Sequence, residues 1–276
     1  YNVGLGYGAI STDVLGSKTT AIGTFALDSQ NFTTATDSHN TAVGYATGQA
    51  ITTGTLNTFI GSLAGDALTA ADSNTAIGYV ALTSDTRGER AIAIGEGALF
   101  SQNFTTESNN YNVAIGYNAG YSIVDGGTFN TFVGGLAGNS VTAGGNTIVG
   151  YGGGTLGTDL TTGVNNCLFG RETGTSSAAG TNQNVFGKDV AGSGDNTFTF
   201  GTGSADSAIA AGGTSISTPS DERYKEEIQT STAGLSFIND LRPVTFKWKK
   251  EKDIPSDHRA YVKGSENRVM LSNGET

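Results

Sequence analysis

Two residues near the C-terminal end of the chain have side chains that could cut a peptide bond. Ser220 and Lys225 lie in the segment Ser-Asp-Glu-Arg-Tyr-Lys. A serine hydroxyl is a weak nucleophile that needs a base nearby, and a lysine can be that base when burial keeps its amine neutral. Five residues of separation put two side chains on opposite faces of a strand, or about 140° apart on a helix. The pair must therefore meet on an irregular turn or between chains, unless it is merely a solvated serine and lysine at a domain start.

The residues that follow this segment predict a helix and then a strand. Leu235, Ile238 and Leu241 fall on one stripe of a helix that Pro243 would end. Residues 243–249 then alternate between apolar and polar side chains, which indicates a strand. We therefore predict a small α+β domain in this part of the chain.

A change in composition separates this domain from the rest of the chain. Residues 1–214 carry 5 basic and 15 acidic side chains, whereas residues 215–276 carry 10 of each. All three prolines, the tryptophan and the methionine also lie in the second part. We therefore predict a first domain over residues 1–204, a linker over 205–219 and a second domain over 220–276.

The first domain is built from a short repeat. Twelve times an aliphatic or aromatic residue comes just before a glycine in nearly the same phrase, as in Asn-Thr-Ala-Ile-Gly at 74–78. These glycines are Gly6, Gly23, Gly44, Gly61, Gly78, Gly95, Gly116, Gly134, Gly150, Gly170, Gly187 and Gly201. Such a period, sustained over about 200 residues, is typical of stacked coils. We predict an all-β parallel solenoid of about 12 coils, or rungs, each with two short strands and two turns. The asparagines that open the phrases should stack at one corner.

Some rungs are four residues longer than the others. Ser-Gln-Asn-Phe-Thr-Thr at 29–34 recurs at 101–106, 72 residues later, which indicates duplication of a block of four rungs. The added residues should bulge from one side of the solenoid. Phe32 and Phe104 could then contact a receptor, although a locally packed loop is the simpler interpretation.

Both faces of each strand are apolar. One face holds residues such as Ile60, Ile77 and Ile115. The other holds Ala42, Phe59, Ala76, Ala114, Phe132 and Ile148. A coil has only one inside, so one apolar face needs another cover, and an identical copy of the chain is the simplest. We expect the set containing Ala42 and Phe59 to be the face that an isolated chain would expose.

Tyrosine follows the repeated glycine in five rungs, at Tyr7, Tyr45, Tyr79, Tyr117 and Tyr151. Such a row could bind sugar rings. It could also be a packing ladder at a corner or between subunits, which we consider the more common reason for such a row.

The repeat resembles the left-handed parallel β-roll heads of trimeric autotransporter adhesins, whose rungs carry phrases of the Asn-Ser-Val-Ala-Ile-Gly type. The resemblance covers roughly residues 1–204, although the rungs here are longer. It implies a homotrimer with the second apolar face at the trimer axis.

The second domain looks like the self-cleaving C-terminal intramolecular chaperone of phage tail fibres and endosialidase tailspikes. The Ser-Asp-x-Arg-x-Lys opening at 220–225, which includes Asp221 and Arg223, the short helix and the Arg-Pro-Val-x-Phe-x-Trp strand match in order. The resemblance implies that Ser220 is the nucleophile, that Lys225 is the base and that the bond between Pro219 and Ser220 is cut. The family continues beyond the point where this chain ends, so we expect an incomplete chaperone.

The remaining chemistry is expected to be limited. The two histidines lie far apart, at His39 and His258, and no Cys-His spacing for a metal occurs. No phosphate-binding loop or calcium-binding repeat is present, so we expect no metal and no cofactor. The single cysteine, Cys167, replaces a small residue of the repeat. A net charge of -10 disfavours nucleic acid, and no run of 18 apolar residues suggests membrane insertion.

These observations favour a trimeric phage tail fibre that presents a receptor-binding surface on the virion and releases its C-terminal chaperone by a single self-cleavage. The receptor would be a glycan or outer-membrane component of the host. The alternative is the head of a bacterial trimeric adhesin on the cell surface. An ice-binding solenoid would need a flat threonine lattice. A polysaccharide-degrading spike would need paired carboxylates, and Asp66, Asp72 and Glu96 are scattered.

Overall fold

The computed structural model describes residues 1–203, 206–210, 249–257 and 261–267. The chain divides into two compact units, Tyr1–Ser220 and Asp221–Thr276, which are described separately. Among the described residues, no helix has the length and apolar character needed to cross a membrane.

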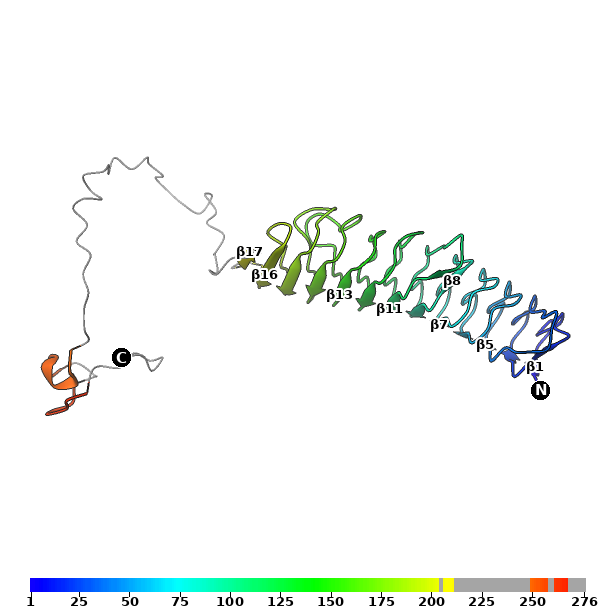
Figure 1. Cartoon of the computed structure of the whole chain (residues 1–276), viewed down its shortest axis with the longest axis horizontal. Coiled ribbons are helices and arrows are strands. Elements are labelled where there is room, and N and C mark those ends of the chain that lie inside the picture. Colours follow the sequence, from blue (N-terminus) through cyan, green and yellow to red (C-terminus); the bar gives the residue numbers. More distant parts are fainter. Residues whose placement is uncertain (204–205, 211–248, 258–260, 268–276) are drawn as a thin grey trace. The chain divides into compact units, whose positions relative to one another are not determined.

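The first unit is a solenoid in which each coil contributes one short strand to a single long sheet (Figure 1). The parallel strands are β1 (Val3–Leu5), β3 (Thr20–Ile22), β5 (Thr41–Val43), β6 (Thr58–Ile60), β7 (Thr75–Ile77), β9 (Ile92–Ile94), β11 (Val113–Ile115), β12 (Thr131–Val133), β13 (Thr147–Val149), β14 (Cys167–Phe169), β15 (Asn184–Gly187) and β16 (Thr197–Gly201). A thirteenth strand, β17 (Ser207–Ala210), pairs antiparallel with β16 and ends the sheet. The expected all-β parallel solenoid of about 12 rungs is confirmed.

The register of the sheet is the same from rung to rung. Within the first nine rungs each strand pairs through equivalent positions, as in Thr58 with Thr75 and Ile60 with Ile77. The longer rung between β3 and β5 keeps this alignment, because Ala21 pairs with Ala42. The extra residues of long rungs are therefore accommodated on the other side of the coil.

The other side of the coil consists mainly of turns. Only four further strands occur in the described residues, and each has two residues: β2 (Gly16–Ser17), β4 (Thr36–Asp37), β8 (Gly88–Glu89) and β10 (Ser108–Asn109). The expectation of two strands in every rung is therefore wrong. The cause is a recurring left-handed backbone, which interrupts extended structure at residues such as Leu56 and Leu63, with φ of 60° and 57°. The amide of Leu63 donates to the carbonyl of Tyr45 one rung earlier, at 2.9 Å, so the strained turns still bond from coil to coil.

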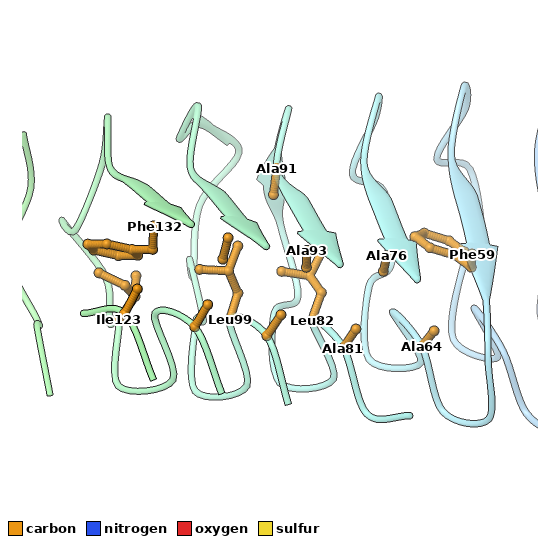
Figure 2. Close-up of a cluster of buried hydrophobic side chains, with 14 of the residues drawn as sticks. Phe59, Ala64, Ala76, Ala81, Leu82, Ala91, Ala93, Leu99, Ile123 and Phe132 are labelled. Carbon is orange, nitrogen blue, oxygen red and sulfur yellow. The ribbon is translucent and has the colours of Figure 1, made fainter. Parts of the chain in front are cut away.

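The inside of the coil is a narrow apolar core. From β3 to β16 the middle residue of each parallel strand points inward, and small residues alternate irregularly with large ones, as at Phe59, Ala76 and Ala93 (Figure 2). Leucines from the facing turns, such as Leu82 and Leu99, pack against them and are fully buried. Two rows of side chains, one from the strands and one from the facing turns, therefore fill the inside of the solenoid along its length.

This arrangement corrects the assignment of the two strand faces. Ala42, Phe59, Ala76, Ala114, Phe132 and Ile148 were expected on the exposed face, and all of them are fully buried inside the single chain. The isoleucine and valine positions face outward instead, and Ile60 and Ile115 are 40% and 38% exposed. The apolar stripe that lacks a cover is therefore the other one.

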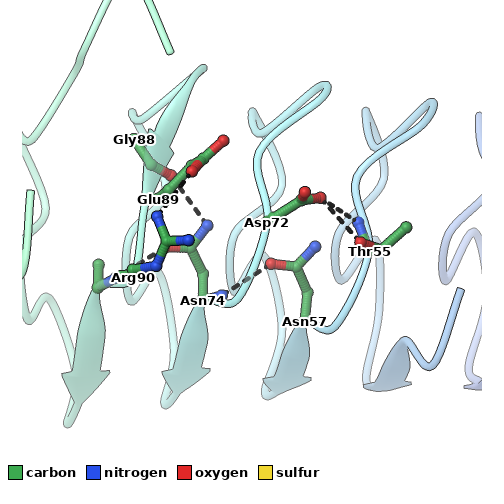
Figure 3. A network of polar contacts seen from close by, with 8 residues as sticks. Thr55, Asn57, Asp72, Asn74, Gly88, Glu89 and Arg90 are labelled. Carbon is green, nitrogen blue, oxygen red and sulfur yellow. Dashed lines mark hydrogen bonds and ion pairs between the residues drawn. The ribbon is translucent and has the colours of Figure 1, made fainter. Parts of the chain in front are cut away.

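A ladder of buried asparagines lines one corner of the solenoid, as expected. The side-chain oxygen of Asn57 accepts the backbone N–H of Asn74 at 2.9 Å, and the amide nitrogen of Asn74 donates to the carbonyl of Gly88 at 2.9 Å (Figure 3). The side-chain oxygen of Asn74 in turn accepts the N–H of Ala91, at 2.9 Å. The same bonds join Asn112, Asn130, Asn146 and Asn166. Each asparagine thus satisfies buried backbone groups of the next coil.

At the opposite end of each strand a column of glycines allows the coils to approach closely. Gly78 has φ of 137°, and a Cβ at this position would lie 2.6 Å from the carbonyl of Gly95 in the next rung. No L-residue tolerates both the backbone conformation and the contact. The repeated glycine of the sequence is therefore required by the spacing of the coils.

The described part of the second unit is a short turn held by charges. The 3-10 helix η2 (Glu251–Asp253) lies beside residues 261–267, where the hydroxyl of Ser265 donates to Glu251 at 2.7 Å. The ammonium groups of Lys250 and Lys252 both bond Glu266 and lower the pKa of its carboxyl to about 2.

The asparagine ladder leads to the first prediction. Asn74→Ala should lower the free energy of unfolding by about 2–5 kcal/mol, because the buried N–H of Ala91 and the buried carbonyl of Gly88 both lose their partner. Asn31→Ala, at an exposed asparagine, should change it little. Denaturant unfolding followed by circular dichroism measures both. An equal, small effect in the two variants would contradict a structural role for the ladder.

Candidate functional site

The residues predicted to carry out self-cleavage lie outside the described residues. This applies to the nucleophile Ser220, the base Lys225, the preceding Pro219, and Asp221 and Arg223. Their roles therefore stay predictions from the sequence.

The two phenylalanines predicted to contact a receptor are packed inside the solenoid. Phe104 is fully buried and Phe32 is 5% exposed. The backbone N–H of Phe104 bonds the carboxylate of Asp85 at 3.0 Å, which draws this residue inward. The receptor contact assigned to Phe32 and Phe104 is therefore wrong in this structure, and the packed-loop interpretation describes them.

The long rungs instead repair gaps in the asparagine ladder. The ladder position holds Ala91 rather than asparagine, and the side-chain oxygen of Asn110 accepts the backbone N–H of Asn112 in its place, at 2.9 Å. Gln102 from the inserted segment bonds the side chains on either side. The amide nitrogen of Gln102 donates to Asp85 at 2.6 Å, and its oxygen accepts from the amide of Asn112 at 2.8 Å. In the sequence, the glutamine that precedes each Asn-Phe-Thr-Thr was the signal that could have predicted this structural role of the inserted segments.

The same repair occurs 72 residues earlier. The ladder position there holds Thr19, and Gln30 bonds Asp13 at 2.6 Å and Asn40 at 2.9 Å. The two inserted segments therefore have a structural role on the inside of the coil.

The scattered acids of the solenoid are engaged by neighbouring coils. Asp72 accepts the N–H and the hydroxyl of Thr55 at 2.6 and 3.0 Å (Figure 3). Asp66 accepts the hydroxyl of Thr83 at 2.5 Å, and burial raises the pKa of its carboxyl. Within the described ranges, no group of three histidines, cysteines or acids is placed to hold a metal ion.

The outer face of the long sheet is the most unusual surface of the solenoid. Each of the twelve parallel strands presents two residues outward, on either side of a middle one that is buried in every strand after β1. These are Val3, Leu5, Thr20, Ile22, Thr41, Val43, Thr58, Ile60, Thr75, Ile77, Ile92, Ile94, Val113, Ile115, Thr131, Val133, Thr147, Val149, Cys167, Phe169, Asn184, Phe186, Phe198 and Phe200. No charged side chain is among them, although this unit carries most of the acidic residues of the chain. A sheet face that meets water normally carries charged residues as well as polar ones, so the lack of charge on this face is unusual.

The edges of this face have a different character. One edge, formed by the residues just before the ladder positions, includes Lys18, His39 and Arg90. The other edge carries the five tyrosines that follow the glycines, at Tyr7, Tyr45, Tyr79, Tyr117 and Tyr151, and these rings are between 53% and 77% exposed. A tyrosine occurs in every second rung, so neighbouring rings are about 9.6 Å apart along the solenoid. Within the single chain the row is therefore largely open to solvent.

Further along the tyrosine edge, a charged cluster replaces the aromatic residues. Arg171 bonds Asp189 at 2.9 Å, and Lys188 lies 3.0 Å from the same carboxylate. The hydrogen bond from Lys188, followed by that from Arg171, lowers the pKa of Asp189. These pairs are exposed, so they contribute little to stability.

Comparison with known proteins gives one match. Residues 220–261 match the family model described as chaperone of endosialidase. Neither the curated proteins nor the solved structures gave a match. The matched segment and the parallel solenoid together fit a tail fibre with a C-terminal chaperone domain.

Proposed function

We propose that this chain is the shaft of a homotrimeric phage tail fibre that presents a receptor-binding surface and is assembled by a C-terminal chaperone, which is released by self-cleavage. The observation that carries the proposal is the chaperone match at residues 220–261, which follows a long parallel solenoid in the sequence. This chaperone family implies assembly of tail fibres as trimers. The match also suggests that the protein belongs to a phage tail.

The uncharged outer face of the sheet is where we place the trimer contact. Twelve rungs at about 4.8 Å give a strip of roughly 58 Å. At about 3.3 Å per residue, each three-residue strand makes the strip about 10 Å wide. The strip is thus roughly 600 Å² for each chain, shared between two neighbours in a trimer. The edges of the face must therefore add to it to reach a standard interface of about 800 Å² per partner. The threonine, valine and isoleucine side chains on it can interdigitate without burying a charge.

The trimer contact can be tested by placing a charge in the strip. Ile60→Lys should prevent stable trimers, because three ammonium groups would be buried near the axis. Leu56→Lys is the matched control, since Leu56 is 57% exposed and the residue at the equivalent position two rungs earlier, Lys18, has the same left-handed backbone. Light scattering coupled to size exclusion should report three chains for the native protein and the control, and fewer for Ile60→Lys. A native monomer would contradict the proposal.

Release of the chaperone is the second part of the proposal. A slender solenoid has contacts mainly between rungs and between chains, so its assembly is slow and benefits from a domain that holds three chains together. Cutting that domain away afterwards would leave a kinetically trapped shaft. The support is the match that begins at Ser220, where the composition changes.

The cleavage prediction concerns Ser220 and Lys225. In the natural full-length protein, Ser220→Ala and Lys225→Ala should each block cleavage between Pro219 and Ser220 while the uncut trimer still forms. Mass spectrometry of the purified protein decides the outcome. A single intact native species, or a cut at another bond, would refute the assigned roles.

The receptor-binding part rests on the row of exposed tyrosines. A tyrosine ring offers an apolar face and a polar hydroxyl, the combination that suits a sugar ring. The spacing of two rungs is comparable to the length of a disaccharide in an extended glycan. The negative charge of the solenoid favours a neutral glycan over an acidic one.

The glycan prediction uses two tyrosines from the middle of the row. The double variant Tyr79→Ser and Tyr117→Ser should lose at least tenfold in affinity for a neutral bacterial polysaccharide on a glycan array. Tyr111→Ser, on the other edge of the sheet and 49% exposed, should bind like the native trimer. Absence of any glycan binding by the native trimer would refute this part of the proposal. Equal binding by the double variant would show that the row is not the site.

A further inference from the structure

We infer that a cluster of phenylalanines at the C-terminal end of the outer sheet face sets the axial register of the three chains. This inference rests on the proposed trimer and adds how its chains are aligned. The cluster consists of Phe169, Phe186, Phe198 and Phe200, which lie on the last three parallel strands, β14 to β16.

The need for such a device follows from the repeat itself. When identical rungs face each other, displacement of one chain by one rung, about 4.8 Å, again places like side chains opposite each other. Thr58 and Ile60 are followed one rung later by Thr75 and Ile77, and the few changes elsewhere, such as Ile92 and Val113, are similar in size. The first nine rungs therefore discriminate weakly between the aligned and the displaced trimer.

The last three rungs differ from the others. Phe169 stacks on Phe186 with ring centroids 5.1 Å apart, Phe186 is 5.4 Å from Phe198, and Phe198 is 5.4 Å from Phe200. Three of these rings remain 36% or 37% exposed in the single chain. They form a continuous aromatic surface on a face that is otherwise aliphatic and threonine-rich.

The occupant of this surface is the same cluster in the other two chains. Aromatic rings need a wider space between facing sheets than valine or isoleucine does. Displacement by one rung would press the Phe169 ring against the position of Val149 in its neighbours and leave Phe200 uncovered. Overpacking at one end and exposure at the other both oppose the displaced state.

The place of the cluster in the chain fits this role. Phe200 precedes the matched chaperone segment by 20 residues. If assembly starts where the chaperone brings three chains together, the rungs with phenylalanine are the first to meet. The register would then be fixed before the degenerate rungs pair.

The experiment moves the cluster by one rung in one kind of chain. The variant Val149→Phe, Asn184→Phe, Phe198→Thr and Phe200→Val carries the same aromatic pattern one rung earlier. Native and variant chains with different tags are co-expressed at full length, and mixed trimers are isolated through both tags. Asymmetric cryo-electron microscopy at a resolution finer than the rung spacing then locates each chain along the axis.

We expect the two kinds of chain to be offset by one rung in most mixed trimers. Mixed trimers with level rungs would overturn the inference, because another element, such as the chaperone, would then set the register. Failure to obtain mixed trimers although each chain forms trimers alone would support it, since mismatched clusters would exclude one another. Native chains that form no trimer would instead refute the proposed function on which the inference rests.

A control keeps the number of changes similar but leaves the cluster in place. The control variant alters the outward face in the middle rungs only, through Ile60→Val, Ile77→Val, Ile94→Val and Ile115→Val. Mixed trimers of this variant with native chains should have level rungs. An offset in the control would overturn the assignment of the register to the phenylalanines.

Discussion

The hydrogen bonds that an asparagine side chain makes to the next coil are the interaction on which the solenoid depends. A coil of about 17 residues has a corner where the chain enters the strand, and backbone groups buried there cannot reach water. Asn57 and Asn74 each accept one N–H from the next coil and donate to one of its carbonyls, so their single side chain satisfies two buried groups. Because the asparagine points along the axis, it also fixes the height of the next rung. Where the ladder position holds Ala91, side chains of the long rung supply partners instead: Asn110 accepts the N–H of Asn112, and Gln102 accepts from its side-chain amide.

Fixing every rung at the same height has a consequence for the sheet. After β1, each parallel strand is paired on both sides and its middle residue is committed to the inside, so only the outward residues are free to change. These outward residues stay uncharged over twelve rungs, whereas the turns and edges carry Lys18, Arg90 and the other charged groups. A protein that needed only a stable coil would not require an uncharged outer face. Charged side chains on a sheet face exposed to water would lower the stability of the fold only slightly. The restriction to uncharged residues fits the proposed contact between chains.

The repeat made the main features of the fold predictable from the sequence. It did not show which face of each strand points inward. The period of the glycines indicated parallel coils, and the asparagines indicated the stacked corner, because each needs one residue type at one backbone position. The face that points inward was assigned wrongly because both faces are apolar. A usable signal existed: Thr58 lies two residues before Ile60 and so shares its face, and a threonine column suits the outside better than a core. The burial of Phe104 depends on Asp85, which lies in the preceding coil, and no local pattern reveals that contact. For Ser220 and Lys225 the sequence and the chaperone match remain the basis of the assignment.

The long rungs show how such a solenoid can vary without losing its sheet. The strands on either side of the insertion at 101–106 stay in register, since Ala93 pairs with Ala114 as any neighbouring middle residues do. Added residues are tolerated where the coil is made of turns, because a turn bonds to the next coil through single amides that can be replaced. They are not tolerated in the strand, where a shift of one residue would turn the core outward. Changes in rung length are therefore confined to the side away from the proposed trimer contact. Surface chemistry on the turns and edges can diversify while the outward face of the sheet stays constant.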